Sequence, residues 1–195
     1  MYKRKEVRKL TGSEEFIHTG DKKFTVLDFW RYGFSNLNSN VLRGALAEYI
    51  VETALKDVED IEIRNPWGDY DVDYQGKTIE VKCCSYLQDW DQLKLSTIQW
   101  SGLKANTLYW NDAVAKQIKQ EKKEYKAQIY VLALLNHKET ETLNILDMDQ
   151  WCFYVLSKDK LQSLTKDGSS VSLSLLKKNG IESVAYHDLK VAIEA

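Results

Sequence analysis

Alternating apolar and polar positions between residues 65 and 85 predict a β-hairpin. Gln75-Gly76 suits a two-residue turn, because glycine readily takes positive φ. Strand residues alternate between two faces, so the hairpin has one apolar and one charged face. A turn at this point gives the pairs Tyr74–Lys77, Asp73–Thr78, Val72–Ile79, Asp71–Glu80, Tyr70–Val81 and Asp69–Lys82. The apolar face is Tyr70, Val72, Tyr74, Ile79 and Val81.

Helical spacing of apolar residues predicts a helix over residues 41–56, entered from the capping residues at 38–40. Its expected apolar stripe is Leu42, Ala45, Leu46, Tyr49, Ile50, Thr53 and Ala54. Residues 129–135 are apolar without alternation, which predicts a central strand buried on both faces. Further strands are expected at 59–64, 93–100 and 151–156, a lysine-rich helix at 111–126, and short helices at 171–178 and 187–194.

This order of elements predicts an α/β fold with a central mixed sheet flanked by helices. A length of 195 residues suits a single domain with a full-sized core. Hydrophobic residues make up 44% of the chain, and no apolar run is long enough to cross a membrane. The charged N-terminal stretch lacks the apolar centre of a signal peptide. We therefore expect a cytoplasmic protein with no membrane partner.

Cysteine and histidine do not point to a metal site. The three cysteines are odd in number and two are adjacent, which favours reduced thiols over disulfides. Their spacing to the three histidines does not fit zinc. Asp, Glu and Lys are therefore the side chains in which chemistry must be sought.

The formal net charge of −2 excludes binding of nucleic acid by overall positive charge. Any contact with phosphate groups must then come from local patches. Lysines gather at residues 3–9 and 116–126, and the candidates for substrate contact are Lys116, Lys119 and Lys123. A merely solvated stretch is the alternative explanation.

Asp71 opposite Glu80 is the most informative pair in the hairpin. Like charges that face each other across two strands repel, and a purely structural sheet gains nothing from them. A divalent cation between the two carboxylates would turn this repulsion into binding energy. The alternative is an ordinary solvated face, which antiparallel strands often carry.

The predicted helix adds Glu48. Glu52 can pair with Lys56 four residues on, whereas the neighbours of Glu48 at that spacing are Gly44 and Glu52. Gly44 costs about 1 kcal/mol relative to alanine inside a helix, which indicates close approach of another backbone or of a ligand. A surface glutamate beside a packing glycine is the alternative.

A helix glutamate, a strand aspartate and a Glu-x-Lys on the next strand resemble the PD-(D/E)XK nuclease superfamily, which has the restriction endonuclease-like fold. The matching residues are Glu48, Asp71, and Glu80 with Lys82. The stretches FWRYGFSNL, RGALAEYIV, SYLQDWDQ, IYVLALL and DQWCFYVL are similar to a bacterial or phage subfamily, over residues 28–156. Tyr70 stands where proline would precede the aspartate, and Asp69 and Asp73 are rival acids.

The resemblance implies an α-β-β-β-α-β core at about residues 41–135 of a single domain, 1–195, with additions at both ends. It implies a Mg²⁺ site, which Mn²⁺ can also fill, formed by Asp71, Glu80 and the Val81 carbonyl with water. Lys82 would position the attacking water or offset phosphate charge. Glu48 would act through water or on a second metal, and Gln88 is a weaker candidate for substrate contact.

We therefore expect a Mg²⁺-dependent nuclease, in the first place a DNA endonuclease of the restriction-like kind. One alternative is an inactive nucleic-acid-binding or assembly module with the same fold. Another is a small-molecule hydrolase that uses the same carboxylates. The choice between DNA and RNA stays open, and so does the oligomeric state, a homodimer included.

Overall fold

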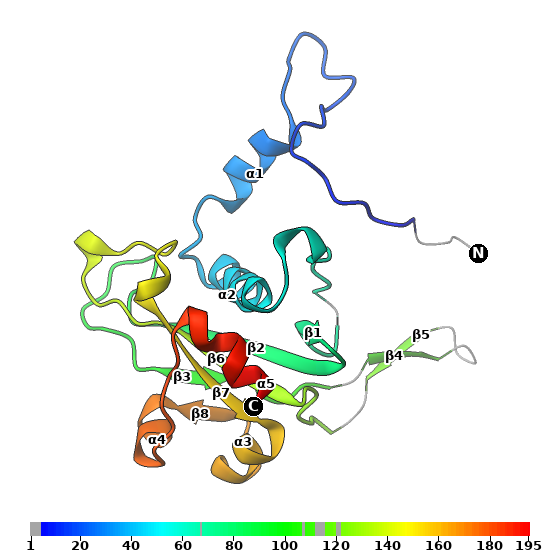
Figure 1. Cartoon of the computed structure of the whole chain (residues 1–195). Helices are drawn as coiled ribbons and strands as arrows, with labels where there is room; N and C mark the ends of the chain where they lie inside the picture. Colours follow the sequence, from blue (N-terminus) through cyan, green and yellow to red (C-terminus); the bar gives the residue numbers. More distant parts are fainter. Residues whose placement is uncertain (1–4, 67, 107, 112–115, 120–121) are drawn as a thin grey trace.

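The computed structural model describes residues 5–66, 68–106, 108–111, 116–119 and 122–195 (Figure 1). A four-stranded mixed sheet lies at its centre, with the strand order β1-β2-β6-β7. β2 and β6 are parallel, and the other two neighbouring pairs are antiparallel. The strands are β1 (Val72–Tyr74), β2 (Lys77–Ser85), β6 (Ile129–Leu135) and β7 (Trp151–Ser157). The predicted α/β class with a mixed central sheet is confirmed.

The hairpin β1–β2 has the predicted register, with Val72 opposite Ile79 and Tyr74 opposite Lys77. Its turn takes φ of +52° at Gln75 and +79° at Gly76, the left-handed pair that a two-residue hairpin turn requires. The expected apolar face is buried at Val72, Tyr74, Ile79 and Val81. Tyr70 departs from it and is 38% exposed, since it precedes the paired part of β1.

One face of the sheet is covered by α2 (Asn40–Leu55) and α5 (Leu189–Glu194) (Figure 1). The Ser39 hydroxyl caps α2 by accepting from the Leu42 N–H. The predicted apolar stripe is wrong in part: Tyr49 is 45% exposed. Apolar residues of α2 occur on all sides of the helix, so their spacing alone did not identify the side that is buried. The residues of α2 that are buried are Arg43, Ala47, Ile50, Val51 and Leu55.

The other face of the sheet packs on a second apolar cluster. There Tyr130, Leu132 and Leu134 of β6 point toward β3 (Gln99–Ser101), β8 (Ser170–Ser172), α3 (Lys158–Leu164) and α4 (Leu173–Lys178). The alternate residues of β6, among them Val131 and Ala133, pack toward α2. β6 is thus buried on both faces, which confirms it as the central strand.

The connection from β2 to β6 differs from the prediction. The expected helix at 111–126 is wrong, because β4 (Leu108–Asn111) and β5 (Lys116–Lys119) pair as antiparallel strands. A thin apolar stripe gives a helix little surface to bury, and Tyr and Trp in this stretch favour strands. Of the strand expected at 93–100, only its end lies in β3, which pairs with β8 outside the central sheet.

Two further predictions concern short elements. The strand expected at 59–64 is wrong: Val58–Asp60 form a 3-10 helix and the following residues are irregular. In the 171–178 stretch, β8 leads directly into α4, so the helix predicted there begins only at Leu173. The last helix is confirmed as α5.

The N-terminal region extends away from the sheet and carries α1 (Val26–Phe34), none of whose residues is buried (Figure 1). A capping box begins α1, in which the Thr25 and Asp28 side chains each accept from the backbone N–H of the other. The Asn36 amide donates to Asp89 at 3.2 Å and ties the end of this region to the loop after β2.

Candidate active site

Asp71 lies immediately before β1 and is held across the hairpin by two backbone contacts. Its N–H donates to the Ile79 carbonyl at 3.0 Å, and its Oδ2 accepts from the Val81 N–H at 2.8 Å. The side chain is half-buried. The hairpin register therefore fixes this carboxylate beside Glu80, as the sequence predicted.

Glu80 and Lys82 occupy alternate positions of β2 and project on the same side of the sheet. The Lys82 Nζ contacts Glu80 Oε1 in an ion pair, and the two side chains are 26% and 16% exposed. Gly102 lies beside the lysine stem: a Cβ built there would be 3.9 Å from Lys82 Cε. The ammonium is thus confined near the carboxylates.

Glu48 reaches the same cluster from α2, where Arg64 binds it through two nitrogens. Arg64 Nη2 donates to Glu48 Oε1 at 2.7 Å, and Arg64 Nε donates to the other carboxylate oxygen. These hydrogen bonds are the main cause that raises the pKa of Arg64, and the charges of Glu48 and Asp71 add to it. Arg64 therefore completes a group of three carboxylates and two cations.

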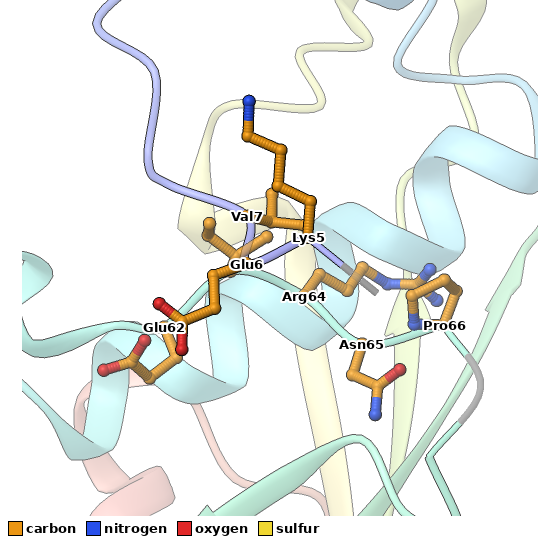
Figure 2. Close-up of a pocket in the computed structure, with 8 residues that line it drawn as sticks. Lys5, Glu6, Val7, Glu62, Arg64, Asn65 and Pro66 are labelled. Carbon is orange, nitrogen blue, oxygen red and sulfur yellow. The ribbon is translucent and has the colours of Figure 1, made fainter. Parts of the chain in front are cut away.

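Arg64 lies on the segment that joins α2 to the hairpin, at the edge of an open concavity of about 710 Å³. Figure 2 shows the N-terminal residues Lys5, Glu6 and Val7 across from it, on a separate part of the chain. Half of the Arg64 side chain, 49%, is exposed. A ligand can reach this cation from solvent.

The three carboxylates affect one another electrostatically. Burial, then the charge of Glu80, then that of Glu48 raises the pKa of Asp71 from 3.8 to about 7. The Val81 N–H and the Lys82 ammonium oppose this rise in pKa. Near neutral pH the cluster thus has more negative charge than its own cations balance, and it gains from an added cation.

The donor set fits Mg²⁺ by its chemistry. Mg²⁺ takes oxygen ligands and is often held by only one or two carboxylates, with waters and substrate phosphates completing the shell. Asp71 and Glu80 supply such a pair, and the Val81 carbonyl is in the same strand. Among the described residues, no group of three or more His, Cys, Asp or Glu side chains is arranged to hold a metal ion.

The rival acids are placed differently. Asp73 is exposed, and its carboxylate accepts from the Gly76 N–H at 3.4 Å, so it serves the hairpin turn. Asp69 is also exposed. Asp71 alone of the three has its carboxylate held on the Val81 N–H beside Glu80.

Gln88 has internal partners. Its amide donates to the Ser85 carbonyl at 2.9 Å and accepts from the buried Arg43 at 3.0 Å. It anchors the loop after β2 to α2, away from the carboxylate cluster. The side chains of Lys116 and Lys119 lie outside the described residues, and Lys123 lines a separate concavity treated below.

Sequence reasoning missed two arginines, Arg64 and Arg43. Arg64 pairs with a glutamate 16 residues earlier, with no periodic relation to it. Arg43 is 4% exposed on α2 and donates to the Asn38 carbonyl at 2.7 Å and to Gln88. The polar residues that flank α2 were the signal for Arg43, since a buried guanidinium needs several acceptors.

Comparison of the chain with protein-family models, curated proteins and solved structures found no match. In the part of the chain that the structure describes, every helix is too short or too polar to cross a bilayer. The function is therefore inferred from the residues of the cluster themselves.

Proposed function

We propose that the chain is a Mg²⁺-dependent nuclease with a restriction endonuclease-like core, and that DNA is its substrate. One observation carries the proposal. Glu48, Asp71, Glu80 and Lys82 come from one helix and the two arms of a hairpin, yet they interact as one charge cluster. A carboxylate pair that can hold a metal ion, with a lysine beside it, can activate a water and neutralise charge in the hydrolysis of a phosphodiester.

Each residue of the cluster has a distinct role in this proposal. Asp71 and Glu80 hold Mg²⁺, which when bound neutralises phosphate charge and lowers the pKa of a water. Lys82 orients the attacking water and offsets charge that builds up on the phosphate oxygens. Its ion pair with Glu80 keeps the ammonium in place before substrate arrives.

Glu48 acts at longer range. Its carboxylate raises the pKa of Asp71 and is itself held by Arg64. With a metal bound at Asp71 and Glu80, Glu48 would orient water and would not itself be a ligand. Arg64 is a counter-charge that limits the repulsion among the three carboxylates.

One observation favours a non-catalytic module of the same fold. Glu80 and Glu48 already have cationic partners in Lys82 and Arg64, so the cluster is largely neutralised without metal. In that case the cluster would stabilise the fold, and nucleic acid would bind without being cut.

A cleavage assay separates the two functions. Supercoiled plasmid and labelled RNA are incubated with wild type, Lys82→Ala and Lys94→Ala in Mg²⁺, Mn²⁺ or EDTA. Lys94 is an exposed lysine away from the cluster and is the matched control. We expect metal-dependent DNA cleavage by wild type and Lys94→Ala, and its loss in Lys82→Ala. Equal cutting by all three proteins would refute the assigned role, and metal-dependent cutting of RNA alone would change the substrate.

A further inference from the structure

Lysine side chains from separate parts of the chain meet beside α3. Lys104, Lys122, Lys123 and Lys158 line a concavity of about 240 Å³, and among the described residues that line it the carboxylates are Glu124 and Asp167. We call these four lysines the lysine surface. Four ammonium groups against two carboxylates leave an excess of positive charge at this place.

Lys104 is held firmly in this surface. Its Nζ lies 2.6 Å from Asp167 Oδ2 and 5.4 Å from the centre of the Tyr125 ring, and only 12% of the side chain is exposed. The Lys104 ammonium, followed by the Gln162 amide, lowers the pKa of the Asp167 carboxyl. The Lys104 side chain is therefore held in one position, whereas most lysine ammonium groups extend into solvent.

The loop that presents Asp167 is also fixed. Lys166 and Asp167 take φ of +52° and +59°, which costs energy for residues other than glycine. The Tyr125 hydroxyl lies 2.8 Å from Thr165 Oγ1 and donates to the Gly168 carbonyl at 2.5 Å. These contacts keep the loop in its strained form, so the surface is built before any ligand arrives.

Positive charge continues on the other side of α3. A second concavity, of about 370 Å³, is lined by Lys160, Lys166 and Lys178, with no carboxylate among the described residues of its lining. Such a concentration of lysines is unexpected in a chain whose net charge is −2. Repulsion among the ammonium groups is relieved by a polyanion.

The lysine surface borders the candidate active site. Gly102 lies against Lys82, and Lys104 follows two residues later, at most about 7 Å along the chain. A second link runs through Gln128, which accepts from the Thr78 N–H of β2 at 3.0 Å and from the Lys158 N–H at 2.8 Å. Thr78, Glu80 and Lys82 share one side of β2.

We propose that the lysine surface binds the phosphodiester backbone of the nucleic acid whose scissile bond enters the candidate active site. This inference rests on the proposed nuclease function and assigns the path of its substrate. Four ammonium groups around one concavity offer several contacts for phosphate groups, which lysine binds as a point charge. Lys123 belongs to this surface through its position beside Lys122 and Lys104, not through a helix.

The test measures binding apart from cleavage. Fluorescence anisotropy follows a labelled DNA duplex in EDTA at several NaCl concentrations. The proteins are wild type, a Lys122→Ala/Lys123→Ala/Lys158→Ala variant, and a control with Lys22→Ala/Lys23→Ala/Lys94→Ala, which removes three exposed lysines elsewhere. Because each lost phosphate contact flattens the slope of log affinity against log salt by about 0.9, we expect a change of about 2.7 in the first variant only.

Each outcome decides a separate point. An unchanged slope in the lysine-surface variant, while wild type binds and cuts DNA, overturns this inference and leaves the nuclease function standing. Loss of binding in that variant, with no cutting by wild type in Mg²⁺ or Mn²⁺, keeps the surface and overturns the nuclease. If wild type binds vesicles of phosphatidylserine but no DNA, the surface contacts lipid and the inference fails. Should the triple variant unfold, the Lys122→Ala/Lys123→Ala variant must still flatten the slope of log affinity against log salt.

Discussion

The candidate active site and the lysine surface are adjacent and carry opposite charge. At the site, the three carboxylates of Glu48, Asp71 and Glu80 meet two cations. At the lysine surface, four ammonium groups meet two carboxylates. The ion pairs Lys82–Glu80 and Arg64–Glu48 hold the geometry of the first region, and the ion pair Lys104–Asp167 holds that of the second. The remaining charge is unbalanced and is available for a ligand.

This contrast shows why net charge is a poor guide to the partners of this chain. The total of −2 over the whole chain conceals two local excesses of opposite sign. Under the proposed function, the first region would attract a cation and the second a polyanion. Adjacent regions of this kind would bring a metal ion and a phosphate backbone together.

Removing a carboxylate from the candidate active site should have the largest effect of the changes considered. Asp71→Ala or Glu80→Ala should lower the cleavage rate by at least about a hundredfold, as expected for loss of a group that stabilises transition-state charge. Mn²⁺ binding, measured by calorimetry, should be lost as well. DNA binding in EDTA should persist, because the lysine surface is unchanged.

Asp73→Ala is the matched control on the same hairpin, since that carboxylate serves only the turn. It should retain both Mn²⁺ binding and cleavage. Loss of metal binding in Asp73→Ala, with Asp71→Ala unaffected, would transfer the metal site to the rival acid.

The pH dependence of stability tests the repulsion itself. With a pKa raised to about 7, folded Asp71 holds a proton that the unfolded chain releases near 3.8. Stability from this group therefore falls as pH rises from about 4 to 7. Asp71→Asn lacks this loss, and in EDTA at pH 8 it should be more stable than wild type by on the order of 1 kcal/mol. Thermal melts across this pH range measure the difference.

Saturating Mg²⁺ at pH 8 should reverse that order, because only wild type gains binding free energy. A less stable Asp71→Asn in EDTA would contradict the proposed repulsion. It would show that the contact with the Val81 N–H outweighs the charge of Glu80 and Glu48.

The hairpin could be predicted because its signals are local. Alternation and the Gln75-Gly76 turn together determine the register, and a slip by one residue would expose the apolar face. That register, with the Glu-x-Lys of β2, placed Asp71, Glu80 and Lys82 correctly. The helix spacing singled out Glu48, which the resemblance to a nuclease superfamily then included, and Glu48 interacts with the same cluster.

The features that could not be predicted from the sequence depend on tertiary contacts. The inner face of α2 depends on which neighbours it meets, and Arg43 is buried there because the nearby Asn38 and the distant Gln88 supply acceptors. The close approach of another backbone expected at Gly44 is wrong for the described residues, since a Cβ built there meets none of their atoms within 4 Å beyond its own helix, and approach of a ligand stays a prediction. The lysine surface draws on residues 104 to 158, so a local lysine count covered only Lys122 and Lys123, and of these only Lys123 was named as a candidate.

Arg64→Ala increases the difference in charge between the two regions, because it makes the net charge of the candidate active site more negative. Without Arg64, the charge of Glu48 acts more strongly on Asp71. At pH 8.5, where Asp71 is ionised, Mn²⁺ should bind severalfold more tightly. Arg31→Ala is the control, because Arg31 is exposed on α1 with only a 3.7 Å ion pair to Asp28. If Arg64→Ala instead loses Mn²⁺ binding, Arg64 must hold Glu48 where the metal needs it.

The smallest expected effect comes from Asp167→Asn, which makes the lysine surface more positive. The change removes the carboxylate charge that holds Lys104, while the asparagine keeps an oxygen to accept from Gln162. DNA affinity in EDTA at low salt should rise a few-fold, and the salt dependence of binding should steepen because one more ammonium is free for a phosphate. Cleavage of bound DNA should keep its wild-type rate, since the active-site carboxylates are untouched. Anisotropy titrations and single-turnover cleavage measure the two effects separately. Weaker DNA binding by Asp167→Asn would show that Asp167 helps binding by positioning the Lys104 ammonium, rather than weakening binding by neutralising its charge. In both regions an ion pair would then orient a lysine toward a phosphate group.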